Sequence, residues 1–396
     1  MVCFMANDAL FQDLRPATRD LPQSGIVELI NAGRDVEGLI PLWIGEGHHT
    51  TPDFICNAAI ESLRNGETFY THQRGISELR QALADYHTTV YGKPFSSERF
   101  FVTGSGMQAV QLAFQSLAGH GDEMIIPTPA WPNFEAAARI AGATPVTVPM
   151  RFENEEWSLS ANDIRSAISE NTRAIYFNSP SNPTGWVASH TVLREILDIA
   201  RETDTWIIAD EVYHRFYYEG QCAPSFYDVM DDTDKIIFVN TFSKNWAMTG
   251  WRIGWISASP SLGQVFENLI QFSTSGVPVF AQRAAVEALK SGEWFVKTLI
   301  QEAQDSLEIL SKVPEKVEKL RFHKPLGAFY LFFCVDGITD SRNAAIRLTR
   351  EAGVGLAPGS AFGEETDHWF RICFAREPKT IEEASDRLTR WLLKNI

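Results

Sequence analysis

The sequence predicts an α/β protein with a large, mainly parallel sheet covered by helices on both faces, together with a smaller α+β unit. Short runs rich in β-branched and aromatic residues alternate with stretches of helical periodicity, which is typical of a parallel sheet. The runs are apolar throughout, as expected for strands that are buried on both faces. Seven of them are predicted to form the large sheet: residues 100–103, 123–127, 143–148, 174–178, 206–210, 235–240 and 254–257.

Helical stretches connect these strands at residues 107–118, 133–140, 160–169 and 191–202. After about residue 285 the pattern changes to helices at 282–289, 294–310, 344–352 and 380–394, with strands at 328–335 and 370–375. We therefore expect three parts. They are an N-terminal arm (1–45) whose helix at 26–33 packs with the small domain, a large domain (46–285) and a small C-terminal domain (286–396).

Composition narrows the class of protein. The 396 residues include 35 Lys and Arg against 50 Asp and Glu, which gives a net charge of −15. Because phosphate backbones repel such a chain and no basic patch is present, we expect no nucleic-acid binding. The cysteines contain no Cys-x-x-Cys pair, so neither a disulfide framework nor a metal site is expected. With no signal peptide and no apolar run of roughly 18 residues, we predict a cytoplasmic protein that binds no membrane.

The segment Thr-Gly-Ser-Gly-Met-Gln-Ala at 103–109 follows a predicted strand and begins a helix. Its small residues allow close approach to the backbone, and the first helical amides and the helix dipole favour an anion such as phosphate. A tight turn is the structural alternative. A dinucleotide fingerprint is a third interpretation, but it requires an acid at the end of the next strand. Asp122 and Glu123 come before that strand, so we do not favour it.

Other polar or aromatic side chains follow neighbouring strands. Asp210 ends an apolar run, and a buried carboxylate needs a cation or hydrogen bonds. It is therefore either a structural cap or the partner of a protonated ring nitrogen. Tyr213 follows three residues later in the sequence. Asn182 lies in an Asn-Pro-Thr-Gly turn that could aim its amide at a ligand. Trp131 lies on a loop, where its indole either stacks on a flat ring or joins the core.

Three basic residues interrupt apolar surroundings. Lys244 lies between two apolar strands, where desolvation would lower the pKa of its amine and make the amine nucleophilic. Arg252 follows eight residues later and could bind a phosphate near the same edge. Arg371 interrupts an apolar strand of the small domain, which indicates a buried ion pair or a fork that binds a carboxylate.

Together these segments resemble the class I/II aminotransferases, fold-type I enzymes that use pyridoxal 5′-phosphate (PLP). The resemblance runs from about residue 40 to residue 375 with the motifs in family order. Its most specific part is Ser-Lys at 243–244 with Met-Thr-Gly-Trp-Arg-Ile-Gly at 248–254. Supporting matches are Gly-Glu at 45–46, Tyr-Thr at 70–71 with Gly75 and Leu-Arg at 79–80, Asn-Pro-Thr-Gly at 182–185, and Asp-Glu-x-Tyr at 210–213.

The resemblance implies a role for each residue. Lys244 would form the Schiff base with PLP and move the proton between Cα and C4′, giving pyridoxamine phosphate. Asp210 would keep the pyridine nitrogen protonated, Tyr213 and Asn182 would bind the phenolic oxygen, and Trp131 would stack on the ring. The residues implied to bind the phosphate are Ser105, Gly106, Met107, Thr241, Ser243 and Arg252, with Tyr70 from the partner subunit of a homodimer.

For the substrate, the resemblance implies that Arg371 binds the α-carboxylate, with Gly45 and Asn182 nearby. Many aspartate-using relatives have a Lys at the position of Met107, where it binds the distal carboxylate. Many relatives also read Gly-Ile-Gly-Glu-Pro-Asp-Phe where this chain has Trp43 to His49. We therefore predict transfer of the amino group of an L-amino acid to a 2-oxo acid, with neutral or aromatic side chains preferred.

Several alternatives remain open. Arg15 and Arg19 could restore a preference for acidic substrates. His48 and His49 are interpreted as a loop pair, because adjacent histidines do not easily face one metal ion. A PLP-dependent carbon–sulfur β-lyase on the same fold is the alternative reaction. A regulatory protein without turnover is disfavoured, because the sequence has no room for a DNA-binding domain before residue 26 and carries the full catalytic set.

Overall fold

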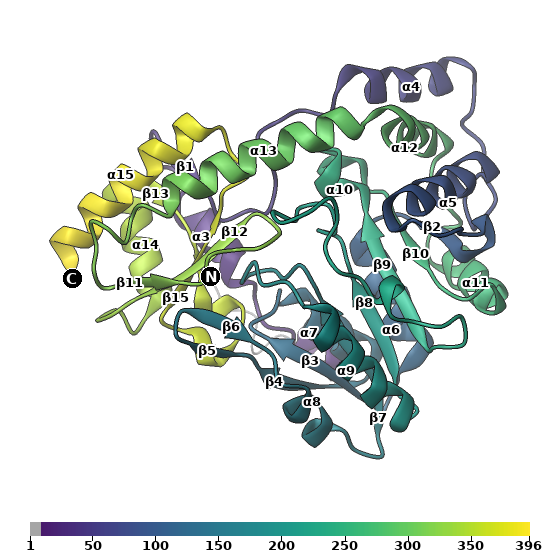
Figure 1. Cartoon of the computed structure of the whole chain (residues 1–396), viewed down its shortest axis with the longest axis horizontal. Helices are drawn as coiled ribbons and strands as arrows, with labels where there is room; N and C mark the ends of the chain where they lie inside the picture. The colour runs from purple at the N-terminus through teal and green to yellow at the C-terminus, as the bar shows by residue number, and fades with distance from the viewer. Residues whose placement is uncertain (1–8) are drawn as a thin grey trace.

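The computed structural model describes residues 9–396, and Figure 1 shows the path of the chain. A seven-stranded sheet has the strand order β2-β10-β9-β8-β7-β3-β4. All neighbouring strands are parallel except β10, which is antiparallel to both β2 and β9. The predicted mainly parallel sheet of seven strands is confirmed. Its strands are β2 (Phe100–Thr103), β3 (Glu123–Thr128), β4 (Thr144–Pro149), β7 (Thr172–Asn178), β8 (Trp206–Asp210), β9 (Ile236–Thr241) and β10 (Gly254–Ser257).

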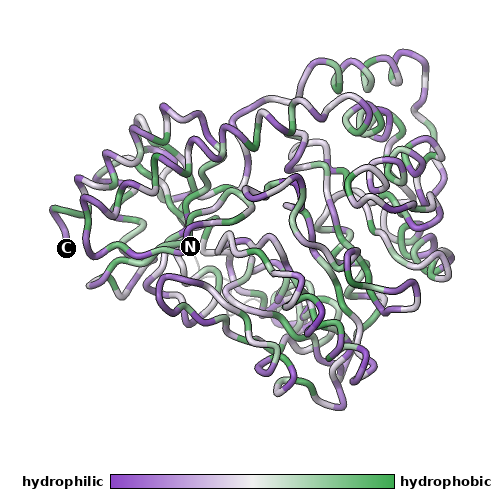
Figure 2. Tube along the Cα trace, viewed as in Figure 1, coloured by the Kyte–Doolittle hydropathy of each residue, from purple (hydrophilic) through white to green (hydrophobic). Residues whose placement is uncertain are grey.

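Helices cover both faces of this sheet, so its strands are apolar on both sides. Successive residues of β8 illustrate this: Ile207 packs into one hydrophobic cluster and Ile208 into another. The first cluster includes residues of α8 (Ala161–Ala167) and α9 (His190–Glu202). The second includes residues of α6 (Gly106–Leu117), α7 (Asn133–Ala141) and α11 (Gly263–Ser273). A third cluster joins the β2 edge to α4 (Asp53–Arg64), α5 (Ser77–Tyr91) and α12 (Val279–Ser291). In Figure 2 the strands are largely hydrophobic and the outer helices carry hydrophilic stretches.

The C-terminal part is built on an antiparallel sheet of order β11-β12-β15-β14. Its strands are β11 (Leu320–Phe322), β12 (Tyr330–Val335), β14 (Ala357–Pro358) and β15 (Trp369–Cys373). The helices α14 (Ser341–Ala352) and α15 (Pro378–Asn395) pack with it, and α13 (Glu293–Leu310) runs between this part and α12 (Figure 1). The described part of the chain contains no helix with the length and apolar character needed to cross a bilayer.

The N-terminal segment packs against this C-terminal part. Helix α3 (Gly25–Ala32) contacts α14, and Glu28 forms an ion pair with Arg342. Strand β1 (Ile40–Pro41) pairs in parallel with β13 (Val354–Gly355). The shorter elements are α1 (Ala9–Gln12), α2 (Pro16–Arg19), α10 (Phe242–Asn245) and the hairpin of β5 (Arg151–Glu153) and β6 (Glu156–Ser158). The predicted domain boundaries remain predictions, and the one at 285/286 falls inside α12.

Candidate active site

Polar side chains gather where three neighbouring parallel strands end. β7 ends at Asn178, β8 at Asp210 and β9 at Thr241. Asn178 and Asp210 are register partners, and the Asn178 amide donates to the Asp210 carbonyl at 3.1 Å. Open α/β sheets bind ligands at this edge. Here it forms one wall of a cleft of about 1060 Å³.

Lys244 lies on the short helix α10, directly after β9. The Thr241 hydroxyl caps this helix by accepting from the Ser243 amide. The Lys244 Nζ lies in the cleft and donates to the Gly45 carbonyl at 2.7 Å. Burial lowers the pKa of Lys244 to about 8, with Arg371 also lowering it and Cys373 opposing the shift. Since its ordinary pKa is 10.5, this amine has far more of its neutral, nucleophilic form at neutral pH than a surface lysine.

Asp210 is a buried carboxylate that forms no ion pair with any residue the structure describes. It accepts hydrogen bonds from the Tyr176 hydroxyl and, at 3.2 Å, from the Val212 amide. Burial nevertheless raises the pKa of Asp210 to about 6, although these hydrogen bonds and the charge of Lys244 act in the opposite direction. A cation placed beside this carboxylate would therefore be strongly favoured.

The N-terminus of α6 offers an anion site in the same cleft. Gly106 and Met107 line the cleft, and Ser105 caps the helix by accepting from the Gln108 amide at 2.9 Å. Thr241, Ser243 and Arg252 line the same cleft. The Arg252 guanidinium donates to the Thr249 carbonyl and, within residues 9–396, forms no ion pair. Free helical amides, hydroxyls and an unpaired guanidinium together suit a phosphate.

A close backbone contact shapes this anion site. A Cβ atom added to Gly254 would lie 2.7 Å from the Asn240 carbonyl oxygen and 2.8 Å from the Gly106 amide nitrogen. Strand β10 can therefore lie against the first turn of α6 only because residue 254 has no side chain. In contrast, a Cβ at Gly250 would meet no atom within 4 Å.

Arg371 is a buried cation without a carboxylate. It is 2% exposed, donates to the Asn182 side-chain oxygen at 2.8 Å and to the Trp43 carbonyl, and lies over the rings of Tyr330 and Phe362 at 4.5 and 4.8 Å. Its Nε has no hydrogen-bond partner in the structure. Among the described residues no acid pairs with it. A buried guanidinium in this state favours a carboxylate ligand.

The structure brings nearly all the predicted site residues together. Of the set, Ser105 and Tyr70 are not among the residues that line the cleft. Ser105 caps the helix that contributes Gly106, whereas the Tyr70 side chain is 92% exposed. Trp131 and Tyr213 line the cleft, and the Tyr213 hydroxyl lies 2.7 Å from that of Tyr330.

Two tyrosines of the site have no counterpart in the sequence prediction. Tyr176 holds Asp210, and Tyr330 contacts both Tyr213 and Arg371. Both lie within apolar strands, so their surroundings in the sequence resemble those of ordinary core aromatics. The partners of these hydroxyl groups become visible only when strands that are distant in sequence pack together.

His48 and His49 lie on a loop, as interpreted from the sequence, but the expectation that they would not easily face one metal ion needs a correction. Adjacent residues were expected not to face one point, yet the Nε2 atoms of His48 and His49 lie 3.8 and 2.6 Å from the same Glu302 oxygen. The two rings lie side by side, with centroids 4.1 Å apart and a tilt of 38°. A bent loop, rather than a regular strand, permits this, since residues 45–49 belong to no helix or strand.

The comparisons with known proteins point to one family. Residues 38–388 match the family model described as aminotransferase class I and II. Aspartate aminotransferase from Pyrococcus horikoshii is 34% identical over 375 residues, which cover 94% of this chain and 95% of that protein. Aromatic-amino-acid aminotransferase 2 from Thermococcus litoralis is 33% identical over 378 residues, or 93% of this chain and 95% of that protein. The crystal structure of aspartate aminotransferase from Thermotoga maritima matches with a TM-score of 0.88 and 32% identity, over 96% of this chain and all of that one.

The depressed pKa of Lys244 predicts a pH-dependent stability. Below about pH 8 the folded protein holds this lysine charged against its burial, and the cost disappears as the pH rises from 8 toward 10.5. Lys244→Met should therefore raise the unfolding free energy of the cofactor-free protein at pH 7 by roughly 1–3 kcal/mol. The gain over wild type should shrink by pH 10. Urea unfolding at both pH values measures it, with the exposed Lys316→Met as control. A gain that grows with pH would contradict the prediction.

The close contact at Gly254 predicts a loss of cofactor affinity. Gly254→Ala should displace the first turn of α6 and weaken PLP binding by about tenfold or more. Gly250→Ala, in the same segment but with open space around its Cβ, is the matched control and should bind PLP as wild type does. Equilibrium titration of the cofactor-free proteins with PLP distinguishes them. Equal dissociation constants for the two variants would show that the contact does not shape the site.

Proposed function

Because the chain belongs to the class I and II aminotransferases, which depend on PLP, we propose that it transfers the amino group of an L-amino acid with a neutral or aromatic side chain to a 2-oxo acid. Transamination and the cofactor follow from the family, whereas the substrate preference and the role of each residue are our proposal. The observation that best supports an amino-acid substrate is the uncompensated charge of Arg371, which lies in the same cleft as Lys244 and Asp210.

The charged and hydrogen-bonding groups of the cleft suit PLP. Asp210 is a buried acid that lacks a cation, and the amides of α6 with Arg252 form an anion site that lacks an anion. Trp131 lines the same cleft and supplies an aromatic surface. A ring that carries a basic nitrogen at one end and a phosphate at the other would satisfy both. These residues therefore fit the cofactor, with Ser105, Gly106, Met107, Thr241, Ser243 and Arg252 proposed to bind its phosphate.

When bound, PLP supplies a carbonyl that condenses with amines and a ring that withdraws electrons from the substrate Cα. In our proposal Lys244 supplies the amine that holds the cofactor and then moves the proton at Cα. Its pKa of about 8 allows it to accept and return that proton near neutral pH. Asp210 keeps the ring nitrogen protonated, and Tyr176 orients the Asp210 carboxylate.

The substrate is oriented by its α-carboxylate. Arg371 would bind it through the guanidinium, which Asn182 and the Trp43 carbonyl already hold in place. Tyr213 and Asn182 would bind the phenolic oxygen of the cofactor. Gly45 lies close to the hydroxyl of Tyr330, so even a methyl side chain at residue 45 would collide there.

The remaining wall of the cleft supports a preference for neutral or aromatic side chains. Three cations line the cleft, Lys244, Arg252 and Arg371, and each already has a proposed role. The rest of this wall is mainly apolar: Ile26, Trp43, Ile44, Met107, Val110, Trp131, Phe134 and Tyr330.

Neither N-terminal arginine supplies a fourth cation to the cleft. Arg15 donates to the Ile140 carbonyl at 2.7 Å, and Arg19 forms an ion pair with Asp20 at 2.7 Å. Neither lines the cleft. These contacts support a neutral or aromatic preference over an acidic one. The relatives do not decide the question, since their names include both aspartate and aromatic aminotransferases.

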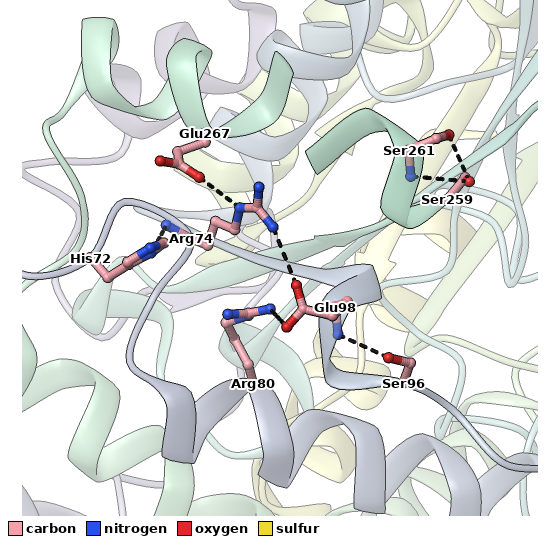
Figure 3. Close-up of polar contacts among 8 residues, drawn as sticks. All are labelled: His72, Arg74, Arg80, Ser96, Glu98, Ser259, Ser261 and Glu267. Atoms are coloured by element: carbon pink, nitrogen blue, oxygen red, sulfur yellow. Dashed lines mark hydrogen bonds and ion pairs between the residues drawn. The ribbon is translucent and has the colours of Figure 1, made fainter. Parts of the chain in front are cut away.

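We further propose a homodimer in which Tyr70 reaches the phosphate of the partner subunit. Tyr70 and its neighbour Phe69 are 92% and 84% exposed, which is unusual for aromatic residues. The chain just after them is firmly anchored (Figure 3): Arg74 binds Glu267 at 2.7 Å and Glu98 at 3.3 Å. The anchored loop thus presents two aromatic side chains to solvent in this chain. A cytoplasmic location also remains our proposal.

The substrate preference is tested by steady-state kinetics. Wild-type kcat/KM should be higher for phenylalanine or leucine than for aspartate by roughly tenfold or more. Met107→Lys should lower that ratio, because it adds a cation to the apolar wall, whereas Val265→Lys on the exposed surface should not. Aspartate turnover that exceeds every neutral amino acid would refute the preference.

The reaction type is tested with no acceptor present. A single turnover should release one 2-oxo acid per active site and no free ammonia. Sustained release of pyruvate and ammonia from cystathionine would instead support the β-lyase alternative. The transaminase and the lyase therefore give different products from the same preparation.

The shared site is tested with hybrid dimers. Tyr70→Ala and Lys244→Ala homodimers should each turn over substrate slowly. The first lacks the proposed contact with the partner's cofactor phosphate, and the second lacks the amine that holds the cofactor. A co-expressed hybrid of the two chains contains one site with both residues intact, so it should recover about half of the wild-type turnover. A hybrid no more active than its parents would show that Tyr70 does not act across an interface.

A further inference from the structure

Three metal-ligating side chains converge outside the cleft described above. Among residues 9–396, one ring nitrogen of His48, one of His49 and a Glu302 carboxylate oxygen all lie within 4.8 Å of one another. His49 Nε2 lies 2.6 Å and His48 Nε2 3.8 Å from the same Glu302 oxygen. The histidines come from the loop after Gly45 and the carboxylate from α13, so the cluster joins segments that are distant in sequence.

The spacing of these atoms is close to that of a transition-metal site. Tetrahedral zinc with bonds of about 2.0–2.1 Å to nitrogen or oxygen places its ligand atoms about 3.3 Å apart. The two separations from the Glu302 oxygen, 3.8 Å to His48 and 2.6 Å to His49, lie on either side of that value, so shifts of less than an ångström would bring both to it. Imidazole and carboxylate are also the ligands that zinc accepts in proteins.

The surrounding contacts hold the ligands in place. The His49 ring packs edge-on against Phe295, in the first turn of α13, with ring centroids 5.7 Å apart. Arg376 donates to the Gly47 carbonyl at 3.2 Å, and the Glu46 carboxylate accepts from Thr249 at 3.3 Å. A metal site needs such fixed ligands, since ordering a free loop would cost most of the binding energy.

Solvent can supply the rest of the coordination shell. The side chains of His48, His49 and Glu302 are 30%, 30% and 29% exposed. These residues line a cavity of about 410 Å³ that also contains Ser243 and Lys244. An ion can therefore enter from solvent and keep a water molecule as its fourth ligand.

We propose that His48, His49 and Glu302 form a binding site for a divalent transition-metal ion of the zinc type. The site is independent of the proposed substrate preference. An occupied site ties the loop that carries Gly45, whose carbonyl accepts from Lys244, to α13. Cysteine spacing in the sequence gave no indication of it, because its ligands are two histidines and a distant glutamate.

Zinc binding to the chelator-treated holoenzyme tests the proposal. Equilibrium dialysis against zinc, with elemental analysis of the protein, should give one saturable ion per chain. The double variant His48→Ala/His49→Ala should lose it, and Glu302→Gln, which keeps the size and polarity of the side chain, should weaken binding by about tenfold or more. His190→Ala is the control, because His190 pairs with Asp228 at 3.2 Å on the surface and should not alter zinc binding.

Cobalt gives a second readout that reports the ligands. Cobalt bound to wild type should show the visible bands of a tetrahedral site, and these should be absent from the double variant. Unchanged circular dichroism and PLP content will show that the variants fold. Zinc binding that is not saturable, or that survives in the double variant, for example on the cofactor phosphate, would overturn the proposal.

Discussion

The parallel pairing of β7, β8 and β9 is the constraint on which the whole site depends. These strands are buried on both faces, and they end together at Asn178, Asp210 and Thr241. Because side chains alternate along a strand, a slip of one residue in β8 would turn Asp210 to the opposite face of the sheet. The turns and the short helix that follow the same strands carry Asn182, Tyr213 and Lys244, so strand register also positions the amine and the amide.

That arrangement gathers charges that do not neutralise one another. Asp210, Arg252 and Arg371 form no ion pair within the described chain, and Lys244 donates only to a carbonyl. Each would be more stable in water or beside an opposite charge. The three hydrophobic clusters around the sheets offset this cost. A cofactor with a ring nitrogen and a phosphate, and a substrate with a carboxylate, would supply the missing opposite charges, which is why the site favours such ligands.

The sheet and most of the cleft residues could be predicted from the sequence, because short local patterns indicate them. Uniformly apolar runs gave the strands, and the Lys244 segment, the glycine-rich turn before Met107 and the position of Asp210 indicated the cleft. Tyr176 and Tyr330 were missed, because a tyrosine within an apolar strand looks the same whether it packs in the core or holds a carboxylate. The convergence of His48 and His49 on Glu302 depends on the bend of a loop and on a helix more than 250 residues away. No local pattern encodes such a meeting.

The central claim is that Lys244 is the amine that holds the cofactor. Among the lysines of residues 9–396, it is the one that lines the cleft. The direct measurement is borohydride reduction of the purified holoenzyme, followed by digestion and mass spectrometry of the peptides. The account predicts a single covalent cofactor label, on the peptide that contains Lys244, at close to one per chain. A label on a different lysine, or no label in a preparation that contains bound PLP, would contradict it.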